Sequence, residues 1–334
     1  MVPVYTRADL EGLIRPGEAM AAMAQAFRAY SSGEAVVPPV GQLDFEDPPG
    51  DCHIKYGYLK GRPTFTVKIA TGFWRNPERG LPSGNGVVLV FSSETGALAT
   101  LFQDEGYLTD LRTAAAGALA AQLLAPAHIE CIGILGAGAQ ARLQLEFLRE
   151  VTACRRVRLW ARTPERAHLL AAALGAGSAP GAGSAPGAGW EIEVVATPHA
   201  VAAGSQLIVT TTAARGWLLS AEAVAPGTHI TAVGADGGGK QELDPKLFAR
   251  AHVRAVDSRA QCSQYGDAAP ALAAGYVRLE ELVELGEIIA HPERGRASER
   301  DVTLADLTGV AVQDMAIAEL ALEKLTRKSA PNPR

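Results

Sequence analysis

A glycine-rich run is the first place where this sequence could do chemistry. Residues 132–141 read Ile-Gly-Ile-Leu-Gly-Ala-Gly-Ala-Gln-Ala, an apolar stretch followed by the pattern GxGxxA. Where a strand turns into a helix, Gly136 permits the tight turn, Gly138 lets a pyrophosphate approach the backbone, and Ala141 allows close packing. The N–H groups of the helix N-terminus then face the phosphates. The run indicates a dinucleotide-binding turn, with an ordinary strand-to-helix turn as the alternative.

The end of the next strand bears on which dinucleotide binds. In folds of this kind an acidic residue at that position contacts the adenosine ribose and favours NAD. Here the position is occupied by Arg162, followed by Thr163. A guanidinium and a hydroxyl suit a 2′-phosphate, so we expect NADP(H) to be favoured over NAD(H). The alternative is a solvated arginine at a strand end.

Two cations stand in otherwise apolar surroundings. Lys68 interrupts an alternating run at 64–70, on the face opposite the apolar side chains. Arg112 falls in the first turn of an apolar helix expected over 111–124, where a cation opposes the helix dipole. That placement is explained if Arg112 and the helix N–H groups hold an anion such as a carboxylate. A solvated position is the alternative for both residues.

Asp236 is a candidate acid or base. It follows a short apolar run at 229–234 and precedes three glycines, and ligands of parallel sheets bind at the carboxyl ends of strands. A turn residue of the Asx type is the alternative. His53 and Lys55 alternate with less polar neighbours, so they share one face of an early strand and could line the same pocket. A polar surface is the alternative there.

The elements that must position these residues fall into two parts. Helices are expected after Thr6 and after Pro16, and strands with one hairpin follow from about 38 to 102. After a helix at 111–124, strands alternate with helices, which argues for a doubly wound parallel sheet of the Rossmann type. The expected strands are at 130–135, 156–160, 194–195, 207–211 and 229–234, the helices at 139–151 and 164–174, and a last helix at 310–325.

Composition excludes several classes of protein. The 334 residues suggest two domains, and 48% apolar with 20% charged residues is typical of a folded chain. A net charge of -5 gives no footprint for nucleic acid, and four scattered cysteines suit neither a disulfide scaffold nor a zinc site, so no metal is expected. No signal peptide or membrane-spanning run is apparent, so we expect a cytoplasmic protein. The Gly-Ala-Gly-Ser-Ala-Pro repeat at 175–189 is expected to be a flexible loop.

Together, these pieces resemble the ornithine cyclodeaminase/mu-crystallin family, in order and over nearly the whole chain. The matching segments are 67–69, 111–115, 136–141, 233–236, 240–244 and 308–314. The resemblance implies a substrate-binding and dimerisation domain of residues 1–115 plus 305–334. It also implies an inserted Rossmann domain of residues 116–304, and a homodimer.

The resemblance also assigns roles to residues. Lys68 and Arg112 would hold the carboxylate of an amino or imino acid, Asp236 would handle protons at the substrate nitrogen, and Lys68 and Asp236 would be the catalytic pair. From their shared strand face, rather than from the resemblance, Lys55 and His53 are expected to be further substrate-binding residues. The predicted cofactor-binding residues are Gly136, Gly138, Ala139, Gln140, Arg162, Thr163, Thr113, Thr211 and Val233.

One departure from the family pattern guides the choice of reaction. Cyclodeaminases resemble this chain around Lys68 but carry an acidic residue and a methionine where this chain has His53 and Lys55. We therefore predict an NAD(P)H-dependent reductase of a small imino acid, such as 1-pyrroline-2-carboxylate. The alternatives are an ornithine cyclodeaminase or amino-acid dehydrogenase using the same site, and a non-catalytic, cofactor-dependent ligand binder.

Overall fold

The computed structural model describes residues 1–175 and 189–329. The expected flexible loop falls almost entirely outside these residues. The described chain forms two compact units, Met1–Arg112 with Val310–Arg334, and Thr113–Gly309. The crossings between the units lie inside α3 and just before α11.

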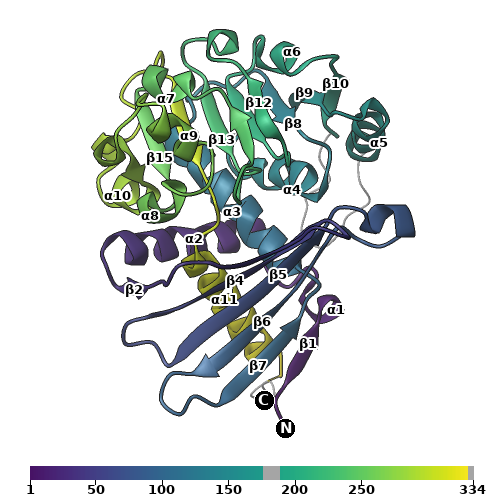
Figure 1. Cartoon of the computed structure of the whole chain (residues 1–334), viewed down its shortest axis with the longest axis vertical. Helices are drawn as coiled ribbons and strands as arrows, with labels where there is room; N and C mark the ends of the chain where they lie inside the picture. The colour runs from purple at the N-terminus through teal and green to yellow at the C-terminus, as the bar shows by residue number, and fades with distance from the viewer. Residues whose placement is uncertain (176–188, 330–334) are drawn as a thin grey trace. The chain divides into compact units, whose positions relative to one another are not determined.

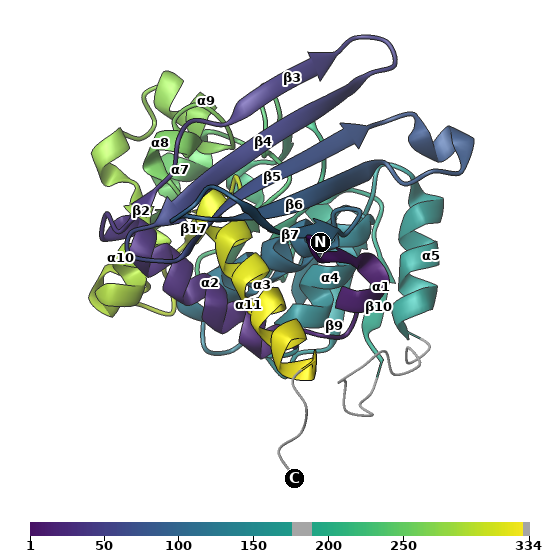
Figure 2. The same ribbon diagram turned by 90° about the horizontal axis from the view of Figure 1, so that it is seen from below.

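The first unit is a mostly antiparallel sheet with helices on one face. The strand order is β1-β7-β6-β5-β4-β2, with β3 also on β4. Helices α2 and α11 lie side by side against the sheet (Figures 1 and 2). The elements are β1 (Val4–Thr6), α1 (Arg7–Leu10), α2 (Pro16–Ser31), β2 (Ala35–Val36), β3 (Gly41–Phe45), β4 (Gly50–Leu59), β5 (Thr64–Phe73), the 3-10 turn Asn76–Arg79, β6 (Gly84–Ser92), β7 (Leu98–Gln103), the start of α3 (Tyr107–Leu124) and α11 (Ala311–Ser329).

The second unit is a parallel sheet of eight strands in the order β10-β9-β8-β11-β13-β17-β15-β16. Its strands are β8 (Ile132–Leu135), β9 (Arg156–Trp160), β10 (Glu191–Val194), β11 (Leu207–Thr210), β13 (His229–Ala232), β15 (Val253–Val256), β16 (Val283–Glu284) and β17 (Thr303–Asp306). Its helices are α4 (Ala139–Leu148), α5 (Pro164–Gly175), α6 (Pro198–Ala202), α7 (Lys246–Arg250), α8 (Arg259–Cys262), α9 (Ala268–Ala273) and α10 (Leu285–Ala290). A small pair, β12 (Arg215–Leu219) and β14 (Gln241–Leu243), lies outside this sheet.

The strand order confirms the expected fold class. The first three strands of this unit run outward from β8 to β10, and the chain then returns to place β11 on the other side of β8. The direction of winding reverses there, and the carboxyl ends of β8 and β11 mark the crevice where ligands of such sheets bind. Strands β8, β11, β13 and β17 are buried along their whole length, as parallel strands covered on both faces must be.

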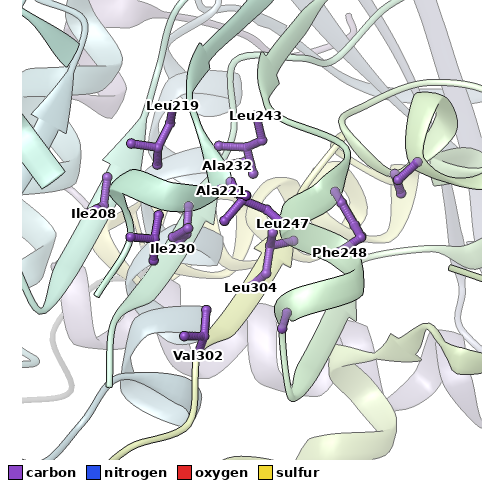
Figure 3. Packing of buried hydrophobic residues seen from close by; sticks show 14 of the residues in the cluster. Ile208, Leu219, Ala221, Ile230, Ala232, Leu243, Leu247, Phe248, Val302 and Leu304 are labelled. Carbon is purple, nitrogen blue, oxygen red and sulfur yellow. The ribbon is translucent and has the colours of Figure 1, made fainter. Parts of the chain in front are cut away.

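A hydrophobic core anchors the segments that follow the carboxyl ends of these strands. Ile208 on β11, Ile230 on β13 and Leu304 on β17 pack with Leu219, Leu243 and Phe248 from the segments that follow (Figure 3). All of them are fully buried. A second cluster, around Ile134, Leu145, Leu159 and Leu170, joins α4 and α5 to the other half of the sheet. The loops between these elements are therefore anchored at both ends.

Candidate functional site

The cations of the first unit are buried on the inner face of its sheet. Lys55 on β4 pairs in register with Lys68 on β5, so both point to the same face, and His53 shares it because it lies two residues away. The exposed fractions are 8% for His53, 5% for Lys55 and 2% for Lys68. The solvated alternatives considered for these three residues are therefore wrong, because α11 covers this face.

A single carboxylate on α11 joins two of these cations. Asp314 Oδ1 accepts a hydrogen bond from Lys68 Nζ at 2.9 Å and from Arg112 Nε at 3.1 Å. Arg112 also donates to Gln313 Oε1 at 3.0 Å. Asp314 is 2% exposed, and its second oxygen, Oδ2, has no hydrogen-bond partner among the described residues. The inner face thus holds a compact group of charges whose acceptor capacity is not used up.

Burial and neighbouring charges set the protonation of this group. Burial lowers the pKa of Lys68 to about 7; the charges of Arg112 and Lys55 act in the same direction, and Asp314 opposes them. Burial alone would raise the pKa of Asp314, but the charges of Lys68, Arg112 and Lys55 outweigh it and hold that pKa below its ordinary value. Asp314 is therefore ionised at neutral pH, whereas Lys68 is close to its midpoint.

Arg112 does not lie where the sequence suggested. Helix α3 begins at Tyr107, so Arg112 is in its second turn and not in its first. The earlier start has a local cause: Asp104 Oδ2 accepts a hydrogen bond from Leu108 N at 2.7 Å and caps the helix. Arg112 is nevertheless buried, at 7% exposed, so its solvated alternative is wrong, and its guanidinium pairs with Asp314. Its expected part in holding an anionic ligand stays a prediction.

In the second unit, the glycine turn has the geometry that a dinucleotide needs. Gly136 has a φ of +118°, and a Cβ there would collide with Thr211 Oγ1. Gly138 is the N-cap of α4, and a Cβ on it would meet no atom of the described residues within 4 Å. A pocket of about 340 Å³ borders the N-terminus of α4. The backbone N–H groups at such a helix end are suited to bind phosphate. The pocket is lined by Ala137, Gly138, Ala139, Arg142, Arg166, Leu169 and Leu170.

Backbone hydrogen bonds bring other predicted cofactor residues to the same edge. Gly136 N donates to Trp160 O at 2.8 Å, which places the end of β9, and so Arg162 and Thr163, beside the turn. Thr211 N donates to Leu135 O at 2.8 Å. Val233 N donates to Thr210 O at 3.0 Å, while Thr113 O accepts from Gln144 on α4 at 3.2 Å. Gln140, in the first turn of α4, completes the set.

Arg162 and Asp236 differ from the buried cations in being accessible. Arg162 is exposed, so its solvated alternative stays open. Asp236 lies in the loop after β13, where its carboxylate is 44% exposed and pairs with Lys240 Nζ at 2.6 Å. An ammonium at that distance stabilises an ionised carboxylate over a neutral acid. The geometry favours Asp236 as a proton acceptor or hydrogen-bond acceptor.

A group of buried carboxyls lies behind this edge. Glu242 and Asp267 are both fully buried, and Asp267 Oδ1 accepts from the backbone N of Glu242 and of Leu243, each at 2.7 Å. Burial raises the pKa of Glu242 to about 7, and burial followed by the charge of Glu242 raises the pKa of Asp267 to about 8. Burial, then the nearby Asp267, raises the pKa of Asp306 well above its ordinary value.

The sequence analysis assigned no role to Asp314, Gln313, Lys240 or Glu242. A signal was present for the first two, since Gln313-Asp314 interrupts an apolar run at 310–317 with two polar side chains in succession. Lys240 and Glu242 lie in the segment 240–244, which carries part of the family resemblance, but nothing in the sequence shows their partners, which become neighbours only through the fold. Among the described residues, no group of His, Cys, Asp or Glu could hold a metal ion. Within the same residues, no helix has the length and apolarity needed to cross a membrane.

Comparison with known proteins agrees with the family resemblance seen in the sequence. The model of the ornithine cyclodeaminase/mu-crystallin family matches residues 2–329. The chain belongs to this family. A Sinorhizobium fredii protein described as an uncharacterized cyclodeaminase is 42% identical over 91% of this chain and 90% of its own length.

Two solved structures of family type match the whole fold. An archaeal alanine dehydrogenase dimer with bound NAD has a TM-score of 0.87 and 32% identity, over 99% of this chain and 98% of that one. The Thermococcus litoralis Delta(1)-pyrroline-2-carboxylate reductase, in complex with NADH and L-proline, has a TM-score of 0.88 and 28% identity over 100% of both chains. The expected Rossmann-type fold with a second domain is confirmed, as is an NAD(P)-dependent oxidoreductase at the level of the family.

Proposed function

We propose that this protein reduces a small imino acid, a cyclic ketimine carboxylate such as 1-pyrroline-2-carboxylate, with a reduced nicotinamide cofactor. The observation that carries the proposal is the buried charge group of the first unit. Three cations, Lys55, Lys68 and Arg112, share electrostatic contact with one ionised carboxylate, Asp314. Burial raises the pKa of the nearby Asp104 carboxyl, which weakens it as a further counter-charge. A substrate carboxylate would supply the missing negative charge.

Each cation has a distinct part in holding that carboxylate. The guanidinium of Arg112 is fixed by Asp314 and Gln313, so its remaining N–H donors are oriented before the substrate arrives. Lys68 contributes an ammonium that is close to its pKa at neutral pH, so an arriving anion draws it to the protonated form. Lys68 therefore both binds the carboxylate and responds to it.

Asp236 would act at the substrate nitrogen. Reduction adds a hydride to the imine carbon, and the nitrogen takes its proton from water beforehand, because a protonated imine accepts hydride more readily than a neutral one. The ionised carboxylate of Asp236 would accept the N–H hydrogen bond of the iminium and stabilise its positive charge. Lys240, at 2.6 Å, keeps Asp236 ionised until the iminium replaces it as partner.

The residues present fit a nicotinamide dinucleotide. Gly138 leaves open space at the N-terminus of α4, and a pocket of about 340 Å³ adjoins it. Gly138, Ala139 and Gln140 would hold the pyrophosphate by backbone N–H groups, and Gly136, whose own N–H donates to Trp160 O, would supply the tight turn. When bound, the reduced nicotinamide supplies the hydride.

The experiment is to supply the protein with 1-pyrroline-2-carboxylate and NADH or NADPH, and in parallel with ornithine and catalytic NAD+. We expect one reduced cofactor to be consumed per proline formed, and little turnover of ornithine. Asp236→Asn should lower turnover by about 100-fold with unchanged cofactor affinity, because the neutral amide cannot offset the positive charge of the iminium. Rapid release of ammonia and proline from ornithine, without net cofactor reduction, would instead establish a cyclodeaminase. No reaction with any imino or amino acid would leave the ligand-binder alternative.

We propose NADP(H) as the favoured cofactor, with Arg162 and Thr163 facing the 2′-phosphate. Arg166, on the first turn of α5, lines the pocket at the glycine turn and adds a second guanidinium to this region. Arg162→Asp should shift the NADPH-to-NADH preference by about fivefold, the upper range for one exposed charge pair. The ratio of kcat/KM for the two cofactors measures it. Equal preference in the unmodified protein and the variant would show that Arg162 is only solvated.

We propose that two copies associate through the outer face of the first unit's sheet. Leu43, Phe45, Tyr56 and Tyr58 point away from the face that holds Lys68, and each is at least 39% exposed. Aromatic side chains gathered on one uncovered face are typical of an interaction surface. The measurement is the molecular mass in solution. Twice 34.9 kDa supports this pairing, and the mass of a monomer at the concentration of the activity assay contradicts it.

A further inference from the structure

Glu242 has an unusual set of hydrogen bonds for a fully buried side chain. Its carboxylate accepts from Thr210 Oγ1 at 2.7 Å, from Thr212 N at 2.5 Å and from Gly234 N at 2.9 Å. Within the described residues, no ion pair involves Glu242. A buried carboxylate without a cation is costly, and an apolar side chain would serve the core better. Its presence therefore calls for a reason other than stability.

The three donors lie at the carboxyl edge of the parallel sheet: Thr210 ends β11, Thr212 lies in the loop after it, and Gly234 lies in the loop after β13. Thr210 and Thr212 flank Thr211, the residue against which Gly136 packs. Gly234 opens the loop after β13 that carries Asp236, and Lys240 closes that loop by its ion pair with Asp236. One carboxylate thus ties the support of the glycine turn to the base of the Asp236 loop.

The backbone around Glu242 is built to allow this approach. A Cβ at Gly234 would collide with Thr212 and with Glu242 Oε2, so only glycine lets the two loops come together here. Asp267 fixes Glu242 from behind through the backbone N–H groups of Glu242 and Leu243. The backbone of Glu242 is thus held by Asp267, and its carboxylate is held by Thr210, Thr212 and Gly234, which is the arrangement of a rigid support.

We propose that Glu242 is a positioning residue for the dinucleotide site, holding the loops after β11 and β13 so that the glycine turn and Asp236 keep the geometry for binding. The inference rests on the proposed function, because it assumes that the cofactor binds at this edge. Both side-chain oxygens of residue 242 must accept hydrogen bonds for this arrangement to form. In Glu242→Gln, one of the two backbone N–H groups, of Thr212 or of Gly234, must face an amide NH₂ and lose its bond.

The test uses the full chain and NADH as the probe. We expect Glu242→Gln to raise the dissociation constant for NADH, measured by fluorescence titration, at least tenfold. Hydrogen exchange of the segments 211–213 and 233–240 should become faster in the absence of cofactor, with the other strands of the sheet unchanged. Asp244→Asn is the matched control: it too is buried and accepts from backbone N–H groups, but from Ala221 and Lys246, outside both loops. We expect it to bind NADH as the unmodified protein does.

A milder variant covers the case in which Glu242→Gln does not fold. Thr210→Val keeps the shape of β11 and removes one donor, so the NADH dissociation constant should rise about threefold with faster exchange in the same two segments. Unchanged NADH affinity and exchange in the folded variant overturns the inference, as does an equal loss of affinity in Asp244→Asn. If the unmodified protein binds neither NADH nor NADPH, the proposed function itself fails.

Discussion

In the first unit a buried carboxylate, Asp314, lies against two cations, whereas in the second unit Glu242 and Asp267 lie against backbone N–H groups and each other. Pairing with cations lowers the pKa of Asp314, while burial without a cation raises the pKa of Glu242 and Asp267. Under the proposed function, the first arrangement keeps positive charge available for the carboxylate of the substrate. The second uses oxygen acceptors to hold backbone in place.

Neutralising Asp314 should have the largest effect of the variants that test this difference between the two units. Asp314→Asn leaves Lys68 and Arg112 buried without their shared anion, so we expect the free energy of unfolding to fall by about 3–5 kcal/mol. An anionic substrate should restore part of this loss, because its carboxylate replaces the missing charge. Denaturant unfolding with and without substrate measures both effects.

The matched control for that variant is Glu319→Gln, on the same helix. Among the described residues, Glu319 accepts a hydrogen bond from a neutral group, the Thr64 hydroxyl, at 3.2 Å. Its removal should change stability by less than about 1 kcal/mol. If the free energy of unfolding falls by the same amount in both variants, Asp314 does not compensate the charges of Lys68 and Arg112.

The pH dependence of catalysis tests the protonation of Lys68 in the first unit. The pKa of Lys68 is about 7, so its ammonium is lost as the pH rises above that value. We expect kcat/KM for an imino acid to fall by about tenfold per pH unit on the alkaline side. Lys68→Arg should remove this decline, because arginine stays protonated, while the titration of the substrate is the same for both proteins. Identical alkaline limbs would assign the decline to another group.

A smaller effect is expected for the second unit, with the opposite sign in stability. The pKa of Asp267 rises from 3.8 to about 8 on folding, so the folded protein keeps a proton that the unfolded chain releases. The corresponding stability is complete below about pH 4 and is lost as the pH rises through 8. For Lys68, lowered from 10.5 to about 7, stability increases with pH across that higher window.

Asp267→Asn isolates this contribution, since the amide keeps an oxygen for the two backbone N–H groups and cannot ionise. We expect the Tm of the variant, relative to the unmodified protein, to increase by about 2 °C or more between pH 5.5 and pH 8. Thermal scans at the two pH values measure the difference. A constant difference would show that Asp267 is charged, or neutral, throughout.

Local signals in the sequence predicted most of the fold. The expected strand at 156–160 has the bounds of β9, and the helix after Thr6 begins with the reciprocal bonds of Thr6 and Asp9. Both depend on neighbouring residues alone. The start of α3 was missed, since Glu105-Gly106 looks like a break; there, both residues adopt a positive φ and Asp104 caps the helix.

The candidate site was predictable only in part, for a physical reason. The glycine turn carries its own signature, because Gly136 and Gly138 are needed within one turn. Lys68 could be noted as unusual, but its partner Asp314 lies 246 residues further along the chain. Likewise, Glu242 meets Thr210 and Thr212 only through the tertiary fold. No spacing within a sequence encodes such contacts.

The return of the chain to its first unit, described above for α11, has a consequence for biosynthesis. A ribosome makes Lys68, Arg112 and the sheet around them long before it makes Asp314, with the whole parallel-sheet unit in between. Until residue 311 and those after it emerge, the inner face of that sheet has neither its covering helix nor its counter-charge. All residues of the second unit are therefore synthesised before the first unit is complete. Until then, Lys55 and Lys68 remain accessible to water.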